Sequence, residues 1–143
     1  MNQPIIYTLL QLPQIAQDLI QKFKDAKIIT LTGDLGAGKT TLVKELLRQW
    51  GVQDEILSPT FTYVNCYKND QGQKILHFDL YRITNLDQFL ELGFDEYLSD
   101  PGVVCLIEWP QVIERLLNEL PKKQVCGIEI VHLSDEQRQL IIK

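Results

Sequence analysis

A glycine-rich segment in the first third of the chain has the residue types that bind a phosphate chain. It contains the pattern G-x-x-x-x-G-K-[ST] and reads Gly33-Asp34-Leu35-Gly36-Ala37-Gly38-Lys39-Thr40-Thr41. Its glycines permit a tight loop whose backbone N–H groups point inward around phosphate oxygens. The Lys39 ammonium can reach the β- and γ-phosphates, and the Thr40 hydroxyl can ligate Mg²⁺. We therefore predict that residues 34–41 bind a nucleoside triphosphate together with Mg²⁺.

Two acidic residues follow apolar stretches that have the pattern of strands. Asp79 comes directly after residues 75–78, and Glu108 comes directly after Val103–Ile107. Ligands of open α/β sheets bind beyond the carboxyl ends of the strands. Both carboxylates would therefore lie beside the phosphate loop if their strands run parallel to the strand before it. A role near Mg²⁺ then competes with a simpler interpretation, a solvated or ion-paired carboxylate at a strand end.

Ser58-Pro59-Thr60 lies between the helix after the phosphate loop and the next predicted strand. A hydroxyl at this place could contact Mg²⁺ or the γ-phosphate and order the loop only when a triphosphate is bound. Ser-Pro is also a common turn element, and on these residues alone the turn is the favoured interpretation.

His77, Asp79 and Tyr81 alternate along the chain, so a continuous strand would place all three on one face. A structural hydrogen-bond network explains such a polar face as well as catalysis does. His132 and Trp50 are interpreted as structural. Trp109 follows Glu108 and could belong to the core, cover the nucleotide site or face a partner.

The segments around these residues predict strands that alternate with helices. Lys27–Thr32 is almost entirely β-branched or Leu, which is typical of a strand buried on both faces. A turn at Asn69–Gly72 indicates an antiparallel hairpin between its two flanking strands. We expect strands at 5–10 (on an edge), 27–32, 61–68, 74–81, 103–107, 125–133 and 139–142, and helices from about 13 to 23 and at 39–50, 84–92 (capped by Thr84, stopped by Gly93) and 110–120.

This order of elements predicts an α/β fold, with one three-layer domain of the P-loop NTPase type spanning residues 1–143 and a mixed, partly parallel central sheet. The length of 143 residues suits one domain, and 45% hydrophobic with 23% charged residues suits an ordinary globular protein. The composition excludes collagen-like and largely disordered classes.

Charge and cysteine content narrow the classes of function. The net charge of -5 argues against a dedicated nucleic-acid binder, although a basic patch around Lys122-Lys123 leaves a local contact with nucleic acid open. No apolar run approaches the roughly 20 residues of a membrane span, so we expect no membrane partner. The three cysteines are odd in number and form no CxxC pair, so we expect a reducing, cytoplasmic environment.

Four motifs together resemble the bacterial TsaE family, also called YjeE. They occur in the family's order and spacing within residues 31–110, and Asp87–Phe94 resembles the stretch that follows the third motif. Phe61 stands where the family frequently has Tyr, and the segments before Lys27 and after Pro110 match only in layout, so no residue is assigned to the adenine. The motifs are the phosphate loop 33–41, Ser58-Pro59-Thr60, His77-Phe78-Asp79-Leu80-Tyr81-Arg82 and Glu108-Trp109-Pro110.

The resemblance implies a small ATPase that binds ATP with Mg²⁺, hydrolyses it weakly alone, and acts with TsaB and TsaD. TsaD transfers a threonylcarbamoyl group to the adenosine at tRNA position 37, and hydrolysis by TsaE resets the complex between rounds. The matching motif positions imply that Lys39 and Thr40 hold phosphate and Mg²⁺, and that Glu108 belongs to the Mg²⁺ site. Thr60 joins a switch-like segment, while Asp79 and Trp109 are needed for activity. Contact with tRNA is implied only through the partners.

Two other functions remain open at this stage: a small-molecule P-loop kinase and an ATP-dependent binding module in which hydrolysis is incidental. The chain lacks the DxxG and NKxD elements expected of a GTPase. It also has only four arginines, with no evident lid that pairs them, as a small-molecule kinase would need to clamp a phosphoryl group. A P-loop protein with few charge-stabilising groups should hydrolyse slowly until a partner supplies or orders the rest.

Overall fold

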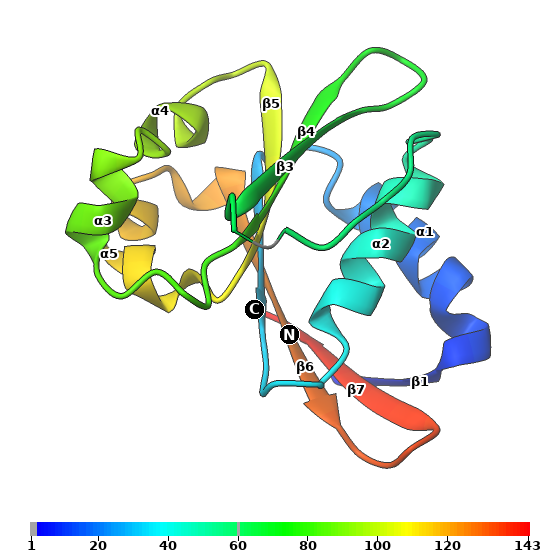
Figure 1. The fold of residues 1–143 in the computed structure, drawn as a ribbon. Helices are drawn as coiled ribbons and strands as arrows, with labels where there is room; N and C mark the ends of the chain where they lie inside the picture. Colours follow the sequence, from blue (N-terminus) through cyan, green and yellow to red (C-terminus); the bar gives the residue numbers. More distant parts are fainter. Residues whose placement is uncertain (1–2, 60) are drawn as a thin grey trace.

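A mixed seven-stranded sheet runs through the centre of the molecule, with helices on both faces (Figure 1). The computed structural model describes residues 3–59 and 61–143. Within this part of the chain the strand order is β1-β7-β6-β2-β5-β4-β3. The predicted α/β fold with a partly parallel sheet is confirmed.

The middle of the sheet is parallel. Strand β2 (Ile28–Thr32) lies between β5 (Val103–Glu108) and β6 (Val125–His132), and β4 (Lys74–Asp79) pairs with the far side of β5. The register places Glu108 opposite both Leu31 and Asp79. The carboxyl ends of β2, β4 and β5 therefore meet at one edge, as the sequence predicted for the two carboxylates.

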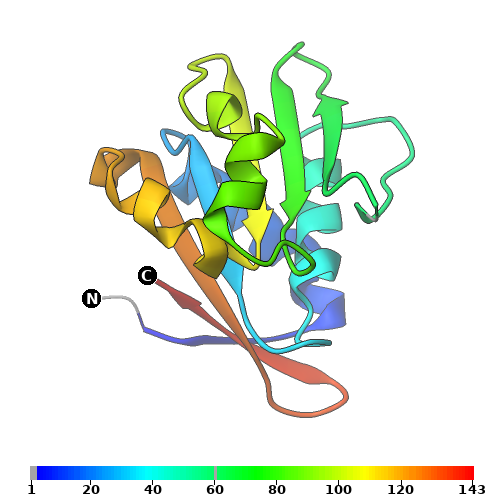
Figure 2. The ribbon, with the colours of Figure 1, turned by 60° about the vertical axis from the view of Figure 1, so that its left-hand side comes forward.

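Antiparallel strands complete both sides of the sheet. Strand β3 (Val64–Lys68) forms the predicted hairpin with β4. On the other side β7 (Gln137–Ile142) pairs with β6, and the edge strand β1 (Ile5–Thr8) pairs with β7. Figure 2 shows how the β6–β7 hairpin and β1 extend together beneath the helices. Strands from both ends of the described chain thus form one edge region of the sheet.

Two helical layers cover the sheet and bury separate apolar clusters. The helices α1 (Leu12–Lys22) and α2 (Lys39–Gln49) pack on one face, where Leu42, Val43 and Leu46 are buried against β-strand residues. The other face carries short helices: α3 (Leu86–Glu91), α4 (Asp95–Leu98), the 3-10 turn η2 (Pro110–Ile113) and α5 (Glu114–Asn118). The predicted three-layer arrangement is confirmed.

Several boundaries differ from the sequence prediction. The cap of the third predicted helix is Asn85, not Thr84, because the Asn85 side chain accepts the Gln88 N–H. The expected single helix at 110–120 is η2 followed by α5, and the short helix α4 was not predicted. The strand β4 ends at Asp79, so Tyr81 lies in a turn beyond it. Two further 3-10 turns are η1 (Leu9–Gln11) and η3 (Lys122–Gln124).

None of the helices in the described ranges has the length and apolar character needed to span a bilayer.

Candidate functional site

The glycine-rich segment connects the buried strand β2 to the helix α2, in the context that the motif requires. Gly33 has φ 150°, and a Cβ there would lie 2.5 Å from the Ile130 carbonyl oxygen of β6, so no side chain fits. Gly38 is the N-cap residue of α2 with φ 112°, in the region where glycine carries no steric penalty. The two glycines let the loop turn tightly against the sheet and present the N-terminus of α2.

Lys39 points back into this loop and is only 5% exposed. Its ammonium donates hydrogen bonds to the carbonyl oxygens of Gly33 and Asp34, the latter at 2.9 Å. The ammonium also lies 4.1 Å from the ring centroid of Trp109, a cation–π distance. Desolvation by burial lowers the pKa of Lys39, and the nearby carboxylates of Glu108, Asp79 and Asp34 partly oppose this shift. The negative charge of an anionic ligand would offset the cost of removing this ammonium from water.

Glu108 is the last residue of β5, and its side chain lies against the first turn of α2. The Thr40 hydroxyl donates to the Glu108 carboxylate, with distances of 2.8 Å to Oε1 and 3.1 Å to Oε2. Glu108 is 2% exposed, although it is acidic. The two residues that sequence analysis assigned to Mg²⁺ are therefore in direct contact.

His77 approaches the same carboxylate from the neighbouring strand. Its Nε2 lies 2.6 Å from Glu108 Oε2, and the side chain is completely buried. Of the alternating polar residues predicted on β4, His77 therefore makes a direct contact with Glu108. The expectation that Tyr81 continues the same strand face is wrong, because the strand has ended before it.

Asp79 ends β4 opposite Glu108 and is half-buried. Its Oδ1 accepts the N–H of Tyr81 at 3.1 Å. Desolvation by burial raises the pKa of Asp79, and the Glu108 carboxylate adds to this effect. The Tyr81 N–H, His77 and Lys39 act in the opposite direction. Two carboxylates, at the adjacent ends of β4 and β5, thus lie near the Lys39 ammonium.

Two aromatic side chains border the site. Trp109 has φ 57°, an uncommon conformation for a residue other than glycine, and it turns the chain away from β5 directly after Glu108. Its ring packs on Tyr81 at a centroid distance of 4.9 Å. The Trp109 ring lies over the Lys39 ammonium and also packs against the apolar cluster on the α3 face of the sheet, so the structure does not decide between a place over the pocket and a place in the core.

A pocket of about 220 Å³ gathers most of the predicted site residues. Its lining residues come from the loop, the start of α2 and the ends of β4 and β5: Leu35, Gly36, Gly38, Lys39, Thr40, Thr41, Asp79, Tyr81, Glu108 and Trp109. Asp34 and Ala37 instead line a neighbouring cavity that also includes His132 of β6. Thr60, predicted as a switch residue, lies outside the described residues.

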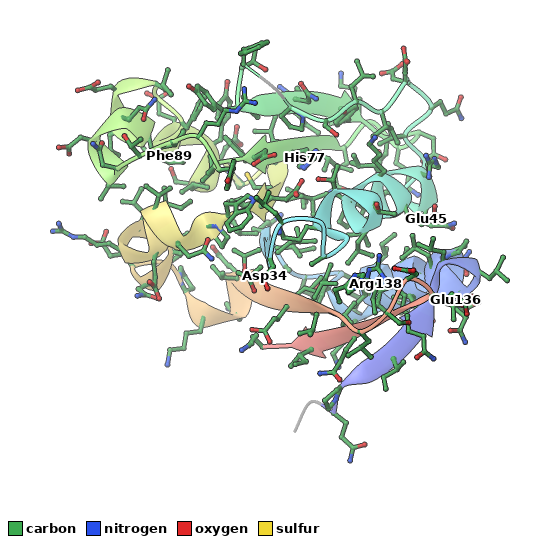
Figure 3. The ribbon with its side chains drawn as sticks, turned by 60° about the horizontal axis from the view of Figure 1, so that its bottom comes forward. Asp34, Glu45, His77, Phe89, Glu136 and Arg138 are labelled. Carbon is green, nitrogen blue, oxygen red and sulfur yellow. The ribbon has the colours of Figure 1, made fainter. Side chains whose placement is uncertain are left out.

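Sequence reasoning gave no role to Arg138, which the fold brings to the loop from β7. Its Nε donates to the Ala37 carbonyl oxygen at 3.1 Å, and Nη1 donates to the Ser134 carbonyl oxygen at 2.6 Å. Figure 3 shows Arg138 between β7 and α2, on the side of the molecule away from His77. No local pattern connects residues 101 positions apart, so only the sheet topology reveals the contact.

The donor set fits Mg²⁺. Magnesium prefers oxygen ligands and usually takes only one or two from the protein, with water and phosphate supplying the rest. The Thr40 hydroxyl and the Glu108 carboxylate provide such oxygens side by side. Within residues 3–59 and 61–143 no group of three or more His, Cys, Asp or Glu side chains is arranged to hold a metal by itself. A metal here would depend on the phosphates of a ligand.

A strand, a glycine-rich loop and a helix at the carboxyl edge of parallel strands define the P-loop class of nucleotide-binding domains. Within this class the chain belongs to the TsaE family. The family model described as "Threonylcarbamoyl adenosine biosynthesis protein TsaE" matches residues 7–140.

Named relatives and a solved structure agree with this placement. The chain is 41% identical over 128 residues to the tRNA threonylcarbamoyladenosine biosynthesis protein TsaE of Rickettsia felis, covering 89% of this chain and 70% of the relative. The Bacillus subtilis protein of the same name is 39% identical, with 82% of this chain and 69% of the relative covered. The crystal structure of Bacillus subtilis YdiB is similar with a TM-score of 0.63 and 29% identity, covering 99% of this chain and 86% of that chain.

Proposed function

We propose that this chain is an ATPase that supports the threonylcarbamoyladenosine modification of tRNA at position 37, acting with TsaB and TsaD. The observation that carries the proposal is the convergence of Lys39, Thr40 and Glu108 in one pocket at the carboxyl edge of the sheet. The name shared by its relatives supplies the pathway. The reaction is the hydrolysis of ATP to ADP and phosphate, in which water attacks the γ-phosphorus and the bond to the β-phosphate oxygen breaks.

The site residues have separate tasks in this proposal. Backbone N–H groups of the loop bind the phosphates, and Lys39 leaves its carbonyl partners to contact the β- and γ-phosphates. Thr40 and Glu108 hold the metal. Mg²⁺, when bound, neutralises charge on the phosphates. Asp79 lines the same pocket, where its carboxylate can orient the attacking water.

The pocket also suggests why hydrolysis would be slow without partners. Among the described residues that line it, Lys39 is the one cation, while Asp79 and Glu108 are acids. Phosphoryl transfer is accelerated mainly by positive charge that stabilises the transition state, and a partner commonly supplies it. We therefore propose that TsaB and TsaD complete the site, in the cytoplasm, and that tRNA is reached only through them.

The test is steady-state ATP turnover of the chain alone and with TsaB and TsaD, measured by phosphate release. We expect weak turnover that rises when both partners are added, and loss of that rise in Lys39→Ala and Glu108→Ala. Lys74→Ala is a matched control, because Lys74 is exposed at the opposite end of β4. Turnover that the partners leave unchanged would contradict the proposal.

A further inference from the structure

The Glu108 carboxylate is held from two sides by residues of different elements. Thr40, at the start of α2, donates to it on one side, and His77 of β4 approaches Oε2 on the other. The His77 Nε2 to Oε2 distance of 2.6 Å is that of a strong, charge-assisted hydrogen bond. In the proposed function Thr40 holds the metal together with Glu108, whereas His77 has no task.

The environment of His77 determines which ring nitrogen carries the proton. A carboxylate only accepts hydrogen bonds, so Nε2 must carry a hydrogen to bond with Glu108. The other nitrogen, Nδ1, is buried and has no hydrogen-bond partner among the described residues. A hydrogen on Nδ1 would therefore be unsatisfied. The hydrogen-bond geometry therefore requires a hydrogen on Nε2, aimed at Glu108.

A histidine at this position is costly for the fold, which makes its contact with Glu108 informative. The neighbours of His77 on β4, Leu76 and Phe78, are apolar and buried, and so is Ile75 on the same face of the strand. An apolar side chain at position 77 would avoid the unpaired Nδ1. The histidine supplies what such a side chain lacks, a hydrogen-bond donor that fixes the orientation of the carboxylate.

We propose that His77 is a positioning residue for the Mg²⁺ site. It orients the Glu108 carboxylate toward Thr40 before the metal binds. The inference rests on the proposed nucleotide site but not on hydrolysis, partners or tRNA. Without His77, the carboxylate would lose one of its two described side-chain anchors and could rotate away from Thr40. Partners that orient a metal ligand in this way typically contribute about 10–100-fold to metal affinity.

Two substitutions separate the hydrogen bond from the shape of the side chain. His77→Leu fills the space but removes the donor. His77→Gln keeps an N–H donor at a similar distance along the side chain, without the ring. Ile75→Val is the matched control, since it alters a buried residue on the same face of β4 that makes no hydrogen bond to Glu108.

The experiment titrates Mg²⁺ into each variant with a fluorescent, non-hydrolysable ATP analogue and also measures analogue binding in EDTA. We expect His77→Leu to raise the Mg²⁺ concentration at half-saturation by about 10–100-fold while binding in EDTA stays unchanged. His77→Gln should remain within about threefold of the parent, as should Ile75→Val. Melting temperatures confirm that each variant is folded.

Three results would overturn the proposal: a parental Mg²⁺ midpoint in His77→Leu, an equal loss in His77→Leu and His77→Gln, or an equal loss in Ile75→Val. If His77→Leu does not fold, the ring ¹⁵N resonances of the parent still decide, because a hydrogen found on Nδ1 in place of Nε2 contradicts the arrangement. Since no partner protein is present, failure here leaves the proposed ATPase function standing. Failure of the partner assay likewise leaves this result intact.

Discussion

The two faces of β4 and β5 differ in how they treat polar groups. Toward α3 and α4 both strands are apolar, and Phe78 packs edge-on against Phe94 at a centroid distance of 5.5 Å. Toward α1 and α2 the strands begin equally apolar, but they end in buried or half-buried polar groups. These are His77 and Asp79 on β4 and Glu108 on β5.

The same strands therefore bury apolar groups on one face and gather polar groups at one end of the other, where we propose the nucleotide site. Apolar burial and aromatic contacts favour folding. Buried charges such as Lys39 and Glu108 cost desolvation energy, which only ligands or precise partners offset. Substitutions on the α3 face should therefore cost stability and spare nucleotide binding, whereas substitutions at the polar end should do the reverse.

The largest expected effect is on the apolar face. Phe78→Ala removes the side chain at the centre of the aromatic cluster with Phe89 and Phe94, and should lower the free energy of unfolding by about 3–5 kcal/mol. Urea unfolding measures this loss. Phe61→Ala is the control, because Phe61 is 82% exposed, and its effect should stay within about 0.5 kcal/mol. Nucleotide affinity of the folded fraction should be unchanged, and a parallel loss of affinity would break the division between the faces.

At the polar end, Lys39→Met should lower ATP turnover by about 10²–10³-fold, because it removes the cation that stabilises the phosphates. Burial lowers the pKa of Lys39, so the folded state disfavours its charge. The melting temperature at pH 7 should therefore not fall. Lys44→Met, elsewhere on α2, should leave turnover unchanged. A large loss of stability in Lys39→Met would show that the site contributes to folding after all.

A smaller effect is expected at the rear of the loop. Arg138→Met removes one side-chain hydrogen bond to the Ala37 carbonyl, and should weaken nucleotide affinity by about 2–10-fold by loosening the loop. Titration with a nucleotide analogue measures it. Arg48→Met is the control, since among the described residues the Arg48 guanidinium pairs with Glu45 alone, on the exposed side of α2. Equal nucleotide affinities in Arg138→Met and Arg48→Met would mean that Arg138 does not support the loop, and that only residues lining the pocket affect binding.

Most of the fold could be predicted from sequence, because it follows from local signals. The apolar runs of β2 and β5 and the turn between β3 and β4 each lie within a few residues. The sequence predictions are wrong where the local sequence signals are weak or where two of them compete. Thr84 and Asn85 are both good capping residues, and the structure uses Asn85. The helix expected after Pro110 starts as a 3-10 turn because Trp109 enters it from a left-handed conformation.

The site was predictable only where it lies within a motif or at a strand end. The phosphate loop and the convergence of Asp79 with Glu108 followed from motif spacing and from the rule for parallel sheets. The contacts of Arg138 with Ala37 and of His77 with Glu108 did not, because each joins residues far apart in the chain. Such contacts depend on strand order and register, which no single segment encodes.

The smallest expected effect tests whether the polar end costs stability. Burial raises the pKa of Asp79, so between its unfolded pKa and its folded pKa the native state binds more protons than the unfolded state. Native stability therefore falls as the pH rises through this window, and the penalty is complete above the folded pKa. Asp79→Asn removes the charge but keeps an oxygen that can accept the Tyr81 N–H.

Asp79→Asn should accordingly be slightly more stable than the parent at pH 7, while the two proteins converge below the unfolded pKa of the carboxyl group, where Asp79 is protonated in both states. Urea unfolding at a series of pH values measures the gap, with Asp54→Asn as an exposed control that should show none. A variant less stable than the parent at pH 7 would mean that the Asp79 charge is compensated within the site. The polar end would then be a stabilising network, and the contrast between the two faces would rest on Lys39 and Glu108 alone.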